Sequence, residues 1–186
     1  MPDSEVRTIR ELIYYQYAKI MARRAFAAQD GKQAKQHHYG FIKKTFRELR
    51  DGVKTWSEIT REDWQLVEAK KRCIYCGTTE DLHREHLVPK SLQITPRCSN
   101  CEMIQSIHNQ ILACGRCNLA KGVKGLYEFY QASHPTEKKS YDLIPPLAEK
   151  KYLKTIFNCH ACAGTLDSGS ASAKALSVSD IDAILH

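Results

Sequence analysis

Two cysteine pairs of identical spacing constrain the fold of this chain more than any other feature. Cys73 and Cys76 stand three positions apart in "CIYCG", and Cys114 and Cys117 repeat that spacing in "CGRCN". Two such turns together present the four thiolates that tetrahedral zinc requires. The segment between the pairs is too long for a compact zinc finger, so we expect a structural element to loop out there. Zinc bound by four thiolates has no open position, and the predicted ion is therefore structural.

Four further cysteines are also arranged in pairs, namely Cys98, Cys101, Cys159 and Cys162. They predict a second zinc site that ties the C-terminal segment to the looped-out element. Two unrelated thiol pairs, or a redox pair, are the alternatives, because the partners of a cysteine cannot be read from one sequence.

The sequence carries no mark of export or of a membrane. None of its apolar runs approaches the roughly 18 residues of a membrane span, and "MPDSEVRTIR" lacks the hydrophobic region of a signal peptide. We therefore expect a cytoplasmic protein, whose reduced thiols bind metal instead of forming disulfides.

Positive charge is concentrated in one stretch. The net charge of the chain is +7 and its pI is about 9.0. Residues 19–54 contain ten lysines and arginines and three acidic residues, so they carry as much net charge as the whole chain. This clustering favours a polyanionic partner, most simply nucleic acid, and Lys43, Lys44 and Arg47 are the expected contacts. A solvated helix face is the alternative.

Hydrophobic periodicity predicts a mainly helical first part. One helix is expected to begin after Asp3 or Ser4 and to end near Gly31, and a second to cover residues 33–50. A third is expected from Thr60. These helices form a basic N-terminal region, residues 1–72, with a predicted role in binding DNA.

The rest of the chain divides into three segments by composition. Residues 73–132 contain "HLV" and "QILAC", which predict strands, and "NLAKGVKGLYEFY", which predicts a helix or a broken helix. Residues 133–163 form an extension in which "KYLKTIF" is a helix or a strand. Residues 164–186 consist of a flexible linker, "GTLDSGSASAKA", and a short tail helix. The expected fold class is therefore α+β.

The looped-out element carries groups suited to acid–base and metal chemistry. Glu85 and His86 are adjacent, Asn109 follows, and Asn118 comes directly after Cys117. A histidine titrates near neutral pH and suits the role of general base. One carboxylate and one amide oxygen leave most coordination positions to water and phosphate, which suits Mg²⁺ or Mn²⁺.

Simpler interpretations of these residues exist. A Glu–His pair on a strand is usually a surface feature, and an asparagine at this position can cap a helix. Neighbouring strand residues point to opposite faces, so Glu85 and His86 can serve one centre only if the strand twists or bulges there.

Taken in order, these residues resemble the HNH endonucleases of the zinc-knuckle type. The motifs "CIYCG", "EHLVP", "NQILACGRCN" and "LAKG" follow that family's succession of CxxC, acid-His-x-x-Pro, Asn, CxxCN and Lys. The resemblance implies a ββα-metal core with a hairpin that carries the acid–His pair and a helix that carries the last ligand. The chain departs from the family in having Glu85 in place of the commoner Asp, Asn118 in place of His, and an additional "RCSNC" segment.

The resemblance implies a metal-dependent DNA endonuclease. His86 would take a proton from the water that attacks phosphorus, and Glu85 and Asn118 would hold a Mg²⁺ or Mn²⁺ ion that offsets the growing charge. Asn109 would hold the hairpin loop or orient His86. The implied products end in 5′-phosphate and 3′-hydroxyl groups.

Further expectations concern the partners. Lys121, Arg84 and Arg116 are expected to contact the backbone of double-stranded DNA, and cutting of both strands favours a homodimer. Restriction or phage defence is one use of such a core; homing, repair and mobile elements are others. The rival interpretations are a non-catalytic zinc module that binds nucleic acid, and a nuclease that acts on RNA.

Overall fold

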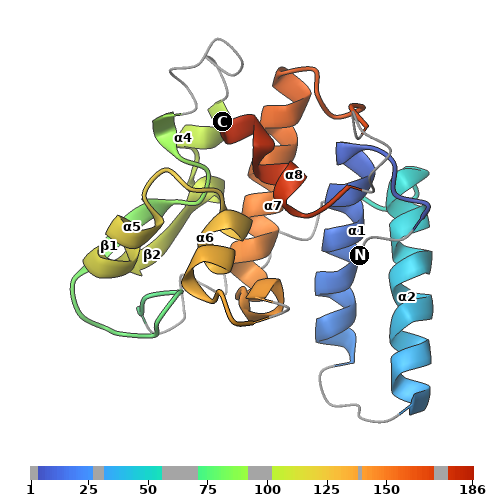
Figure 1. The fold of residues 1–186 in the computed structure, drawn as a ribbon, viewed down its shortest axis with the longest axis horizontal. Helices are drawn as coiled ribbons and strands as arrows, with labels where there is room; N and C mark the ends of the chain where they lie inside the picture. Colours follow the sequence, from blue (N-terminus) through green and yellow to red (C-terminus); the bar gives the residue numbers. More distant parts are fainter. Residues whose placement is uncertain (1–3, 27–31, 56–70, 92–101, 138–139, 170–175) are drawn as a thin grey trace.

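The computed structural model of the chain combines helices with a small antiparallel sheet (Figure 1). It describes residues 4–26, 32–55, 71–91, 102–137, 140–169 and 176–186. The expected helix from Thr60 lies outside the described residues, as do Cys98 and Cys101. Within these ranges, no helix combines the length and the apolar character needed to cross a bilayer.

Two long helices, α1 (Ile9–Ala25) and α2 (Lys32–Arg50), pack side by side at one end of the molecule (Figure 1). The observed α2 confirms the helix expected over residues 33–50. The first helix begins later than Asp3 or Ser4, because Thr8 supplies a capping box. Its hydroxyl oxygen accepts from the Glu11 amide at 3.2 Å, and the Glu11 carboxylate accepts from the Thr8 amide at 3.2 Å.

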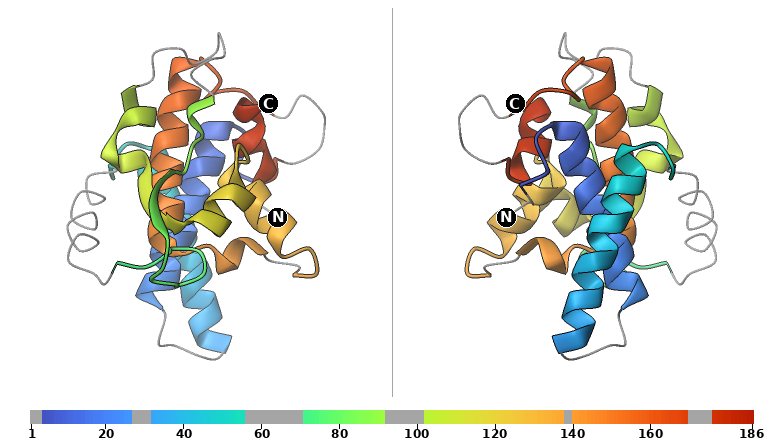
Figure 2. Two further views of the ribbon diagram at one scale, coloured as in Figure 1. Left: turned by 90° about the vertical axis from the view of Figure 1, so that its left-hand side faces the viewer. Right: turned by 90° about the vertical axis from the view of Figure 1, so that its right-hand side faces the viewer.

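A third long helix, α7 (Pro146–Cys162), lies between the α1–α2 pair and the sheet (Figures 1 and 2). The stretch "KYLKTIF" is therefore the middle of a 17-residue helix, which starts with a proline in its first turn. One hydrophobic cluster runs from α1 and α2 through α7 to the residues around the sheet. Residues on both sides of the expected boundary between residues 72 and 73 contribute to this cluster.

The sheet has two strands, β1 (Leu82–His86) and β2 (Gln110–Cys114), paired so that Leu82 faces Cys114 and His86 faces Gln110. The prediction of a strand at "QILAC" is confirmed. The strand expected at "HLV" is displaced, since β1 ends at His86 and the next two residues are fully buried beyond it.

The helix α5 (Gly115–Lys121) follows β2 directly, and α6 (Leu126–Ser133) comes after a break at Gly122. Gly122 has φ 52°, a backbone conformation that suits glycine. Of the two alternatives that the sequence left open here, a helix or a broken helix, the structure shows the broken one. The described chain also contains short helical elements: α4 (Glu102–Gln105), η2 (Ile107–Asn109), η3 (Ser140–Leu143), α8 (Ser179–Asp182) and η4 (Ala183–Leu185).

The C-terminal segment packs onto the rest of the molecule. The backbone amides of Ile9 and Arg10 donate to the carbonyls of Ser168 and Leu166 at 3.0 and 2.8 Å. The first residues of the expected linker therefore contact the start of α1, with Leu166 buried and Gly169 bridged to Thr8. The tail helix α8 is also attached to the molecule. Its Asp182 carboxylate accepts hydrogen bonds from Glu128 of α6 and Tyr152 of α7.

Candidate functional site

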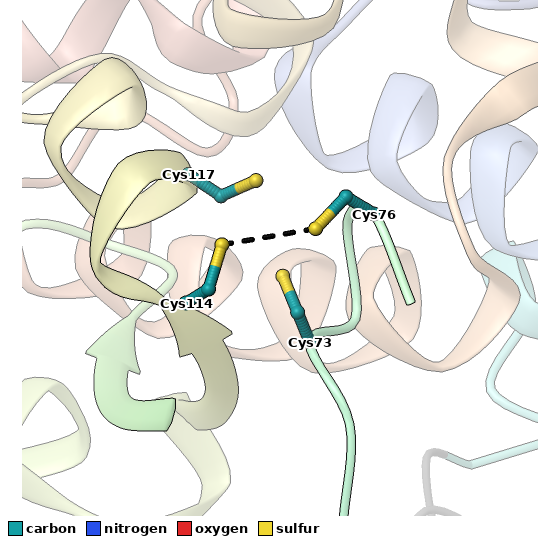
Figure 3. A group of neighbouring side chains, drawn as sticks. All are labelled: Cys73, Cys76, Cys114 and Cys117. Atoms are coloured by element: carbon teal, nitrogen blue, oxygen red, sulfur yellow. Dashed lines mark hydrogen bonds between the residues drawn. The ribbon is translucent and has the colours of Figure 1, made fainter. Parts of the chain in front are cut away.

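Four cysteines converge at the base of the sheet. Figure 3 shows their sulfur atoms pointing toward one another, from the turn before β1 (Cys73 and Cys76), the end of β2 (Cys114) and α5 (Cys117). The four atoms all lie within 4.8 Å of one another, and the Cys76 and Cys114 sulfurs are 3.7 Å apart. A tetrahedral zinc ion with bonds of about 2.3 Å places its sulfur ligands about 3.8 Å apart. The cluster therefore fits a zinc ion, as the cysteine spacing predicted.

Local backbone geometry explains why the first pair forms a knuckle. The Cys73 amide donates to the Thr78 carbonyl at 2.7 Å, and the Gly77 amide donates to the Cys73 carbonyl at 2.9 Å. Gly77 takes φ 78°, which closes the turn without a steric cost. Between the two thiols, the ring of Tyr75 packs edge-on against Phe129 of α6 at 5.2 Å between centroids, which anchors the knuckle in the main core.

The surroundings of the sulfurs shift the pKa values of two of the thiols in opposite directions. Burial raises the pKa of Cys73, but hydrogen bonds from the backbone at Cys114, Cys76 and Tyr75 outweigh burial and bring that pKa down to about 7. Burial and the three neighbouring cysteines raise the pKa of Cys117. A bound cation would let all four sulfurs be thiolates at once.

Only two of the four cysteines of the predicted second zinc site lie within the described residues. Cys159 is buried in α7 and Cys162 is exposed at the end of that helix. Since Cys98 and Cys101 lie outside the described residues, the second zinc stays a prediction.

Three of the four predicted catalytic residues line one pocket. Glu85 and His86 reach it from the end of β1, and Asn118 reaches it from α5. The pocket has a volume of about 380 Å³. The remaining residues that line it are Arg84, Pro89, Lys90, Ser91, Gly122 and Val123. Neighbouring side chains along a strand point to opposite faces, but this alternation ends at His86, the last residue of β1. Glu85 and His86 can therefore border the same space.

Lys121 is the residue whose place differs most from its expected one. It is fully buried, with its ammonium nitrogen 3.0 Å from Glu85 Oε1 and 3.2 Å from the backbone carbonyl oxygen of His86, to which it donates. In this arrangement the side chain faces the protein interior instead of a phosphate. Burial raises the pKa of Glu85 and lowers the pKa of Lys121, and the charge of each partner opposes that shift in the other.

The surroundings of His86 favour its neutral form. Burial lowers its pKa below the ordinary 6.5, and the nearby ammonium groups of Lys90 and Lys121 lower it further. Its Nε2 atom lies 3.4 Å from the side-chain nitrogen of Gln110 on the facing strand. A neutral imidazole at the edge of a pocket can accept a proton at neutral pH.

Asn109 lies behind the pocket instead of lining it. This fully buried side chain accepts from the Val88 amide at 2.8 Å and donates to the carbonyls of Val88 and Ile104 at 2.9 Å each. It thereby joins the segment after β1 to α4, and the chain between these contacts and His86 is short. The geometry matches the first of its two expected roles, that of holding the loop.

The basic residues fall into two groups. Arg84 and Arg116 are exposed near the strands and α5, as is Lys90, which the sequence analysis had not selected although it directly follows the "EHLVP" motif. The α2 residues lie on the far side of α1 from the sheet (Figure 1). There Lys43 and Arg47 bind Glu5 at 3.4 and 2.7 Å, and Lys44 is mostly exposed.

Comparison with known proteins adds no assignment to this geometry. The chain matched no protein-family model, no curated protein and no solved structure.

Proposed function

We propose that this protein is a metal-dependent DNA endonuclease of the HNH type. The observation that carries the proposal is the meeting of Glu85, His86 and Asn118 around one pocket that two cationic side chains, Arg84 and Lys90, also line. The pocket thus offers a single phosphate everything that phosphodiester hydrolysis needs: a general base, oxygen ligands for a metal ion and positive charges that bind the phosphate.

The chain's own residues divide the work. Burial and the nearby lysines lower the pKa of His86, which favours the neutral imidazole that accepts the proton of the attacking water. Arg84 and Lys90 attract the phosphate backbone to the pocket. Asn109 keeps the segment after β1 in place, which fixes the position of His86.

The oxygen donors suit a hard cation. Lys121 contacts the Oε1 atom of Glu85, and we assign the second carboxylate oxygen, together with the side-chain oxygen of Asn118, to Mg²⁺ or Mn²⁺. Such an ion supplies positive charge beside the scissile phosphate.

One observation favours a second candidate, a non-catalytic zinc module that binds nucleic acid. The ammonium of Lys121 already balances the charge of Glu85, as it would in a site that has no use for a metal ion. Both candidates share the zinc cluster and the exposed cations, and they differ only in cutting. The pathway, whether restriction, phage defence, homing, repair or mobile elements, is a prediction that the resemblance alone supports. The homodimer is a prediction that rests on the need to cut both strands with one site per chain.

A nicking assay separates the two candidates. Supercoiled plasmid and, in parallel, structured RNA are incubated with the wild-type protein in Mg²⁺ or Mn²⁺, and with the His86→Ala variant. The matched control is His83→Ala, which changes an exposed histidine of the same strand, bonded to Asp81 at 2.7 Å. The endonuclease proposal expects nicking of DNA by the wild type and the control, and its loss in His86→Ala at unchanged zinc content.

Retained binding in a gel shift, with no cutting of either substrate by the wild type, would favour the non-catalytic module. Cutting of RNA alone would redirect the proposal to an RNA nuclease.

A further inference from the structure

Two aliphatic side chains stand exposed at the end of α5. Leu119 is 85% exposed and Val123 is 65% exposed. Among the described residues six large hydrophobic side chains are exposed, and these two fall within residues 119–123. A single exposed aliphatic residue is ordinary on a protein surface, so the meaning of this pair depends on what surrounds it.

The surroundings are cationic and belong to the candidate site. Val123 lines the same pocket as His86 and Asn118, together with Arg84 and Lys90. Arg116 is exposed one helical turn before Leu119. The sequence from Gly115 to Lys124 contains no acidic residue. An apolar tip within a positively charged surface complements a duplex, whose outer backbone is anionic and whose stacked bases are apolar.

The base of this tip is rigid. α5 is joined at its beginning to the cysteine cluster through Cys114 and Cys117, and near its end to β1 through the Lys121–Glu85 pair. Gly122 then breaks the helix, with its amide bound to the Asn118 carbonyl at 2.9 Å, and the chain turns at Val123. Opening a base step costs a few kcal/mol, which contacts of the bent DNA with the protein must offset.

We propose that Leu119 and Val123 form an apolar wedge that enters between base pairs of duplex DNA and unstacks them beside the pocket. The inference rests on the proposed function for its ligand, and it assigns the DNA distortion to two side chains to which the proposed hydrolysis gives no role. Unstacking at this point bends the backbone toward Arg84 and Lys90, which presents a phosphate to His86.

The wedge is tested by its effect on DNA twist, without any cutting. Relaxed plasmid is incubated with the protein and a type IB topoisomerase, which needs no divalent ion, and the linking number is read on a gel after the protein is removed. The wild type is expected to leave negatively supercoiled topoisomers, because inserted side chains unwind the duplex. The Leu119→Ala/Val123→Ala double variant is expected to lose most of this shift.

Val53→Ala is the matched control, since Val53 is 74% exposed in the turn that follows α2. It is expected to keep the full shift. An equal shift in the wild type and the double variant, at equal DNA occupancy, overturns the proposal. So does a change from dimer to monomer in the double variant by sedimentation, which would make the pair a contact between copies.

The two proposals fail separately. Plasmid nicking by a wild type that gives no linking-number shift overturns the wedge and leaves the endonuclease in place. A linking-number shift without nicking in any metal overturns the endonuclease proposal and leaves the wedge in place.

Discussion

The ammonium of Lys121 binds the Glu85 carboxylate at 3.0 Å and the backbone carbonyl of His86 at 3.2 Å, so one side chain of α5 holds two successive residues of β1. Both charged partners are buried. Each would be costly to desolvate alone, and each is stabilised in its charged form by the other. The strand end and the helix are thereby kept in a fixed relation at the edge of the pocket.

Replacing Lys121 by Met should therefore destabilise the protein strongly, by about 3–5 kcal/mol, because the Glu85 charge loses its buried partner. The Lys121→Met/Glu85→Gln double variant should recover much of that loss. Urea denaturation of the wild type, both single variants and the double variant measures the coupling. Simple additivity of the two single effects would show that the ion pair does not hold the strand end.

Replacing Cys114 by Ser should release zinc and unfold the region around the sheet. Structural zinc contributes about 10–16 kcal/mol in small zinc domains, and the whole stability of a typical domain is about 5–15 kcal/mol. Metal analysis and thermal melting followed by circular dichroism check this outcome. A folded variant with full zinc content would contradict the assignment of the four-cysteine cluster.

The exposed Cys162 provides the control for that experiment and reports on the predicted second site. Cys162→Ser should leave the zinc at Cys73, Cys76, Cys114 and Cys117 in place. A fall from two zinc ions to one in this variant, and equally in Cys98→Ser, supports the second site; unchanged stoichiometry rules it out.

Asn109→Ala should cost on the order of 3 kcal/mol, because it leaves the amide and carbonyl of Val88 and the carbonyl of Ile104 without their buried partner. The adjacent Gln110→Ala is the control, since Gln110 is only half-buried and its side-chain contacts are 3.4 Å long. Chemical denaturation should give a clearly larger loss for Asn109→Ala. Equal effects would mean that Asn109 does not fasten the segment after β1.

Asp182 should make stability depend on pH in an unusual direction. Burial raises its pKa from 3.8 to about 6, although it accepts hydrogen bonds from the Tyr152 hydroxyl at 2.6 Å and from the Glu128 amide at 2.9 Å. Between these two values the folded protein holds a proton that the unfolded chain has lost. The contribution of Asp182 to stability therefore falls as the pH rises through this window, by about 3 kcal/mol at most.

The comparison of wild type with Asp182→Asn isolates this effect, since any acid release of zinc changes both proteins alike. The free energy of unfolding is measured for each at several values of pH between 4 and 7. The wild type should lose stability relative to the variant as the pH rises, with no further change above the raised pKa. A constant difference at every pH would contradict the shift. Asp167 should show the opposite sign, because Arg10 holds the pKa of that exposed carboxyl below its usual value.

Local signals account for what the sequence predicted well. α2 and β2 follow from periodicity and a short apolar run, and the break between α5 and α6 falls at a glycine, Gly122. The cysteine cluster follows from the identical spacing of two pairs, although these pairs are far apart in the sequence. The grouping of Glu85, His86 and Asn118 around one pocket was expected from the order of motifs, and the pocket brings the three together.

Long-range contacts account for what the sequence did not reveal. Nothing near Lys121 in the chain indicates that its ammonium turns inward to Glu85. The stretch "KYLKTIF" reads as ambiguous because α7 is covered on several sides and its burial follows no single face. The contacts of residues 166–169 are made with the start of α1, which lies at the other end of the sequence.

The position of α7 has a consequence for any duplex that engages this protein. α7 packs on α1, and its Lys151 donates to the backbone carbonyls of Ile107 and Gln110 at 3.1 and 2.8 Å, so the helical pair is braced against the start of β2. The α2 cations therefore lie on the far side of α1 from Arg84 and Lys90 (Figure 1). Contact with both sets would require the nucleic acid to curve around the outside of α1, so the length of DNA protected from a footprinting reagent becomes a direct measure of how far that curvature extends.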